Sequence, residues 1–67
     1  MKIKIDNESD AMYISFVEDA EVIESEEIKP GLIVDYNKEE KIVGIELVGI
    51  REKMPELDLK NISLETN

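Results

Sequence analysis

Residues 11–17 read Ala-Met-Tyr-Ile-Ser-Phe-Val, a stretch dense in side chains that favour β-structure. Successive side chains of a strand point to opposite faces of a sheet, so Met12, Ile14 and Phe16 share one face and Tyr13 lies on the other. An apolar face of this kind is normally buried against another part of the protein. The stretch therefore predicts a central strand of a sheet.

Further strands are expected on both sides of this stretch. Before it, Ile3 and Ile5 alternate with polar residues, and the turn-forming cluster Asn7 to Asp10 makes a hairpin loop. After it, we expect strands at residues 22–28, 32–36 and 42–48, separated by a type II turn at Lys29-Pro30-Gly31 and a polar loop at 37–41. The glutamates of residues 22–28 predict an edge strand.

The C-terminal part is expected to be helical. Gly49 ends the last strand, Ile50 to Met54 can start a helix, and Pro55 interrupts it, so Glu56 to Ser63 is the favoured helical segment. The predicted fold is a single α+β domain over residues 1–67, an antiparallel β-meander of about five strands with a C-terminal helix packed on one face. We expect the opposite face to carry Ala11, Tyr13, Ser15, Val17, Leu32, Val34 and Tyr36.

The charge of the chain limits its partners. Among 67 residues, 17 are acidic and 8 are basic, which gives a formal net charge of -9. Nucleic acids and anionic membrane surfaces repel such a chain, because binding to them depends on lysine and arginine. A small basic protein is compatible with the charge, and opposite charge would speed its association. The alternative is that the charge serves solubility alone.

Residue types also argue against catalysis. The chain has no histidine and no cysteine, so the usual base near neutral pH and the usual thiol nucleophile are both missing. We therefore expect no enzymatic activity and no cofactor. No run of apolar residues is long enough for a membrane helix, and residues 1–4 do not resemble a signal peptide, which predicts a cytoplasmic protein.

Carboxylates provide the alternative to a protein-interaction role. The run Asp6 to Asp10 offers oxygen ligands, but a calcium loop starting at Asp6 would need glycine at Ala11 and glutamate at Val17. A hairpin loop in which Asp6 or Asp10 accepts backbone hydrogen bonds explains the run better. Asp35 and Glu46 lie inside predicted strands, and if those strands pair, the two carboxylates could lie near each other or near a cation; two close carboxylates would raise at least one pKa. The alternative is that each is solvated on the sheet face away from the helix. A divalent-metal protein or small enzyme would use Asp6, Asp10, Asp35 and Glu46.

An interaction surface is predicted from the aromatic residues and the C-terminal segment. Tyr13 and Tyr36 are predicted either as interface anchors on a half-covered face or as ordinary packing on that face, and Gly44 leaves a flat patch beside them. Ile50 and Met54 extend this surface into the C-terminal segment. These residues predict either a homodimer or an interface with a second protein.

Several motifs resemble one family of small proteins, the YuzE-like domain of unknown function 2283. They are Ala11-Met12-Tyr13-Ile14 with Asp6 and Asp10, Glu24-Ser25-Glu26-Glu27-Ile28, Gly31-Leu32-Ile33-Val34-Asp35-Tyr36, and Val43-Gly44-Ile45-Glu46-Leu47. The resemblance implies a compact sheet with a helix, no established enzymatic activity and, for some relatives, a proposed place as antitoxin in toxin-antitoxin pairs. The acidic charge of this chain adds the hypothesis that the partner is a small basic toxin. The chain departs from the family pattern after Val48.

Overall fold

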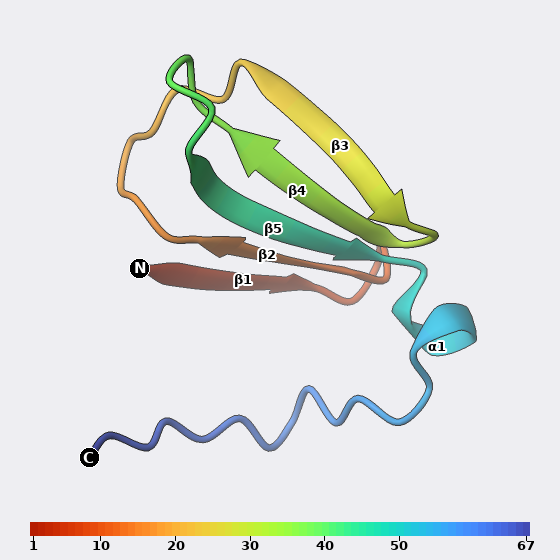
Figure 1. Cartoon of the computed structure of the whole chain (residues 1–67). Helices are drawn as coiled ribbons and strands as arrows, with labels where there is room; N and C mark the ends of the chain where they lie inside the picture. The colour runs from red at the N-terminus through yellow and green to blue at the C-terminus, as the bar shows by residue number, and fades with distance from the viewer.

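Five antiparallel strands form one sheet in the computed structural model, which describes residues 1–67 (Figure 1). The strands are β1 (Lys2–Asp6), β2 (Ala11–Ser15), β3 (Glu24–Lys29), β4 (Leu32–Tyr36) and β5 (Ile42–Val48). All five predicted strands and the antiparallel α+β class are confirmed, and β3 lies at an edge as expected. The bounds of two strands differ from those predicted, because β2 ends at Ser15 and β3 starts at Glu24. The order in space, which the sequence left open, is β1-β2-β5-β4-β3. β5, the last strand in the chain, therefore lies between the β1–β2 hairpin and the pair formed by β4 and β3.

Turn residues fix the tight connections. Gly31 has a φ of 85°, the positive value that a type II turn needs after Pro30. Space requires glycine there as well, because a Cβ atom would lie 2.7 Å from the Val48 carbonyl oxygen. In the loop before β5, the Asn37 side-chain oxygen accepts hydrogen bonds from the amides of Glu39 and Lys41, each at 3.0 Å.

The helix is shorter than expected and lies earlier in the chain. A single turn, α1 (Ile50–Lys53), follows β5 at the end of the sheet (Figure 1). The prediction of a helix at Glu56 to Ser63 was wrong. Asp58 instead accepts hydrogen bonds from the Lys60 amide at 3.0 Å and from the Asn61 side chain at 2.6 Å, and such local bonds compete with helix formation. Residues 54–67 form no regular element and no backbone hydrogen bond to a strand.

The strand register divides the side chains into two faces, because directly opposite residues share a face. We call one the apolar face; it carries Ile3, Ile5, Met12, Ile14, Leu32, Val34, Ile45 and Leu47 from the four strands β1, β2, β4 and β5. We call the other the polar face; it carries Lys2, Lys4, Tyr13, Ser15, Ser25, Asp35, Gly44 and Glu46, together with Glu27 and Ile33.

One predicted grouping is corrected by this register. Leu32, Val34 and Tyr36 were expected beside Tyr13, but Val34 is opposite Ile45, which is opposite Ile14. These β4 residues thus belong to the apolar face. The alternation of side chains within β4 was predicted correctly. Which of these side chains share a face with Tyr13 of β2 depends on β5, which lies between the two strands.

The sheet is a single layer with little interior. Eight of the 67 residues are buried, and no large side chain is completely enclosed. The radius of gyration is 12.7 Å, against about 11 Å expected for a compact domain of this length. No helix of the chain has both the length and the apolar character required to span a membrane. The core consists of Ala11, Met12, Val34, Val43 and Ile50.

Candidate functional site: a carboxylate pocket on the polar face

A polar row crosses all five strands on the polar face. It runs Lys2, Ser15, Gly44, Asp35, Ser25 in the order β1-β2-β5-β4-β3. Asp35 is the buried charged residue of this row, and it is only 9% exposed. The Ser25 hydroxyl donates a hydrogen bond of 2.7 Å to Asp35 Oδ1. A strand interior thus holds a carboxylate where an apolar side chain is usual.

A second carboxyl group meets Asp35 from the neighbouring strand. Glu46 lies two residues beyond Gly44 on β5, on the same face, and Gly44 is opposite Asp35. Burial raises the pKa of Glu46 to about 7, with further contributions from its hydrogen bond to Asp35 and from repulsion by that carboxylate. The predicted proximity of these two acids is therefore confirmed. With a pKa of about 7, the Glu46 carboxyl is about half protonated near neutral pH.

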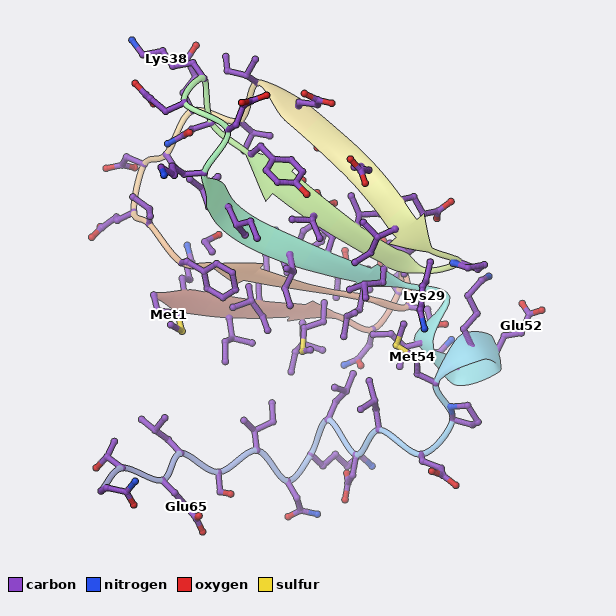
Figure 2. The ribbon with its side chains drawn as sticks, viewed as in Figure 1. Met1, Lys29, Lys38, Glu52, Met54 and Glu65 are labelled. Carbon is purple, nitrogen blue, oxygen red and sulfur yellow. The ribbon has the colours of Figure 1, made fainter.

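A pocket of about 430 Å³ opens beside Asp35. Its floor is the polar face, at Ser15, Asp35 and Gly44, and its wall is the connection between β2 and β3, residues 16–23. Met1 and Lys2 line it where β1 begins, and Figure 2 shows Met1 at the end of the sheet away from α1. The pocket thus lies between the middle of the sheet and a long connection.

Gly44 has no side chain that could fill this pocket from below. A Cβ atom at this position would lie 2.9 Å from the Ile14 carbonyl oxygen, closer than real contacts allow, and 3.6 Å from Asp35 Oδ2. Any larger residue would push β2 away from β5 and crowd the carboxylate. Glycine here thus permits both the strand pairing and access to Asp35.

The other two predicted carboxylates serve the loop between β1 and β2. Asp6 Oδ1 accepts hydrogen bonds from the amides of Glu8 and Ser9, both at 3.1 Å, and the Ser9 bonds hold the pKa of Asp6 below its usual value. Asp10 Oδ2 accepts a 3.0 Å bond from the Arg51 amide and so holds the first turn of α1. The expectation that Asp6 or Asp10 accepts backbone hydrogen bonds is confirmed.

The four carboxylates of the metal alternative do not come together. Asp6 ends β1 and Asp10 ends the loop that follows it, whereas Asp35 and Glu46 form a pair in the middle of the sheet. No group of three or more carboxylate, histidine or cysteine side chains is placed to hold a metal ion.

The five residues predicted as an interface lie in three places. Tyr13, opposite Glu46, and Gly44 are on the polar face, whereas Tyr36 belongs to the other face. Ile50 is buried in α1, and the half-buried Met54 lies where α1 meets the sheet (Figure 2). They do not make one continuous surface.

Sequence reasoning did not find Ser25 or the wall formed by residues 16–23. Ser25 sits among glutamates in an exposed strand, which gives no sign of a part-buried hydrogen bond. The detectable signal was Asp35 itself, a charge between apolar neighbours inside a strand.

The fold and the site define a small α+β protein with one antiparallel sheet and a carboxylate pair on its polar face. The family described as "Protein of unknown function (DUF2283)" matches residues 2–51, about three quarters of the chain, so the protein belongs to this family. The matched range ends within α1. No curated protein and no solved structure matches the chain.

Proposed function

We propose that this protein is a protein-interaction module that binds a small basic protein through its apolar face, as an antitoxin binds its toxin. The observation that carries the proposal is a sheet face of aliphatic side chains over which no second sheet packs, so that only Met12 and Val34 at its centre are buried. Ile3 is 46% exposed and Phe16 37% exposed. Domains normally bury such a face against another layer of structure, so a partner is the expected cover.

Half-buried side chains continue this surface across the sheet. Ile14, Ile45 and Leu47 are each only partly covered, although they occupy the middle of the sheet. Burying apolar area yields about 25 cal/mol per Å², so these side chains would contribute to binding as well as to folding. Phe16 continues the alternation of β2 beyond Ser15, and its amide still bonds to the Val43 carbonyl at 2.8 Å.

Charge favours a basic partner over a second copy of the chain. The net charge is -9, so two copies repel each other over their whole surfaces. Glu24 and Glu26 are opposite Tyr36 and Val34, which places both acids on the side of the apolar face. A cationic protein would find apolar area bordered by negative charge. Binding without catalysis fits the absence of histidine and cysteine.

The experiment isolates a partner and then tests which face binds it. Tagged protein captures its partner from lysate of its own cells; that partner is purified, and its affinity is measured at low and high salt. Phe16 and Tyr13 are both 37% exposed and lie on opposite sides of the sheet, so Phe16→Ser and Tyr13→Ser make a matched pair.

We expect a basic partner whose affinity falls with salt and falls about tenfold or more in Phe16→Ser, with Tyr13→Ser close to wild type. Equal effects of the two substitutions would contradict docking on the apolar face. Sedimentation of the isolated chain tests whether a second copy covers the apolar face instead. A dimer that Phe16→Ser dissociates would assign this face to a second copy and contradict the proposal of a basic partner.

A further inference from the structure

The pocket on the polar face contains a negative charge without a counter-ion. Asp35 is 9% exposed, and apart from the proton of Glu46 its hydrogen-bond donor is the neutral hydroxyl of Ser25. The one ion pair of the chain joins Arg51 and Asp10, so no lysine or arginine neutralises Asp35 or Glu46. A buried carboxylate normally has a cationic partner, because leaving water costs it several kcal/mol.

We propose that the pocket beside Asp35 binds a guanidinium group. The cavity of about 430 Å³ has room for such a group and its alkyl stem. Asp35 would accept its N–H donors on the floor, while Val17 and Val22 on the wall would contact the stem. This inference is independent of the docking surface proposed above, because the pocket lies on the opposite face of the sheet.

Guanidinium suits this pocket better than a metal ion does. Calcium and magnesium need about six oxygen ligands, whereas the chain provides no cluster of three metal-binding side chains here. A guanidinium group is planar, pairs with a carboxylate through two N–H donors and is weakly hydrated, so it loses little on entering a partly closed site. Ser15 Oγ, on the same floor, can accept a further N–H.

The surrounding charges leave the site net negative. The polar face and its borders present the acids Glu46 on β5, Glu27 on β3, and Glu18 and Asp19 in the connection. Lys2, Lys4 and Asp6 of β1, the α-amino group of Met1 and Tyr13 of β2 also face this side. Neither lysine is within ion-pair distance of Asp35.

A cation bound at Asp35 lies close to Glu46, whose pKa is raised to about 7 by burial and by Asp35, and favours the ionised form of Glu46. Binding of guanidinium therefore releases the Glu46 proton, and by linkage the affinity increases by about tenfold between pH 6 and pH 8. Glu46→Gln holds no titrating proton at this position and should flatten that increase.

The test follows backbone amide resonances by NMR during titration with three compounds. N-acetyl-arginine methylamide represents an arginine side chain of a peptide, agmatine represents a free small molecule, and N-acetyl-citrulline methylamide is the neutral isostere of the first. We expect saturable shifts at Ser15, Ser25, Asp35 and Gly44 with at least one cationic compound and none with citrulline. Shifts with agmatine alone would assign the site to a free molecule; shifts with both would assign it to the guanidinium itself, including that of a peptide.

Matched variants decide whether Asp35 is responsible. Asp35→Asn should weaken binding by about tenfold or more, the usual effect of losing a charged hydrogen-bond partner. Asp6→Asn makes the same change of charge at the end of β1, outside the pocket lining, and should leave affinity unchanged. Equal binding of the citrulline compound, or undiminished binding by a folded Asp35→Asn protein, would overturn the proposal.

Discussion

The two faces of the sheet bury different chemistry at their centres: Val34 on the apolar face is 6% exposed, and its neighbour Asp35 on the polar face is 9% exposed. Toward its border the apolar face is open to solvent, where Ile3 is 46% exposed and Phe16 37% exposed. The connection between β2 and β3 borders the pocket at Asp35, whereas the five strands pack side by side in one sheet with no second sheet over the aliphatic residues. This chain thus partly encloses the Asp35 carboxylate on one face and leaves aliphatic side chains exposed on the other.

The largest expected effect concerns Gly44, on the floor of the pocket. Gly44→Val places a branched side chain 2.9 Å from the Ile14 carbonyl oxygen at its first atom, which should lower the free energy of unfolding by about 3 kcal/mol or prevent folding. Urea denaturation followed by circular dichroism measures this. A loss below about 0.5 kcal/mol would mean that β2 and β5 are not packed as described.

The next effect tests whether the apolar face contributes to stability before any partner binds. Val34→Ala removes two methyl groups from a residue that is 6% exposed, and should cost about 2 kcal/mol. Val22→Ala makes the same change in the connection, where the side chain is 49% exposed, and should cost much less. Equal losses in urea denaturation would show that the apolar face needs its partner to become ordered.

A pH profile separates the two faces. The pKa of Glu46 is raised in the folded state from 4.5 to about 7, so its protonation stabilises the fold at low pH. This contribution is complete below pH 4.5 and is lost as the pH rises through 7. Allowing for partial solvent exposure, the loss is roughly 1 to 2 kcal/mol. Glu46→Gln should remove that loss between pH 5 and 8, whereas Val34→Ala should lower stability equally at every pH in this range.

The smallest effect concerns the C-terminal segment. Deleting residues 56–67 should cost about 0.5 kcal/mol, because Leu57, Ile62 and Leu64 are 44%, 53% and 90% exposed and only Leu59 is half-buried. Thermal unfolding of the shortened chain measures this. A loss above about 2 kcal/mol would mean that the segment covers the apolar face after all.

Local chemistry made most of the fold predictable. Alternation of apolar residues and the density of β-forming side chains identified the strands, and Pro30-Gly31 identified a turn, because these signals depend on neighbouring residues only. The phase of β4 relative to β2 was not predictable, since it depends on which strand lies between them. The helix assigned to residues 56–63 failed because the Asp58 side chain accepts hydrogen bonds from Lys60 and Asn61, and no periodicity reveals such a turn.

The candidate site was predictable only in part. Asp35 and Glu46 were identified as charges within apolar strands, and their proximity was expected on condition that those strands pair. The sequence could not supply the pairing, the hydroxyl of Ser25 or the wall of residues 16–23, because each depends on contacts between distant parts of the chain. Tyr13 and Tyr36 were grouped together for the same reason, and the register separates them.

The strand order also sets the sequence of events in folding. β5 is the last strand in the chain, yet it lies in the middle of the sheet, with Ala11 opposite Val48 across a long separation in sequence. The hairpin of β1 and β2 and the hairpin of β3 and β4 can each form locally, but closing so long a loop is entropically costly and slow. On a ribosome, the N-terminal hairpin must therefore wait with an unpaired edge until most of the chain has been synthesised.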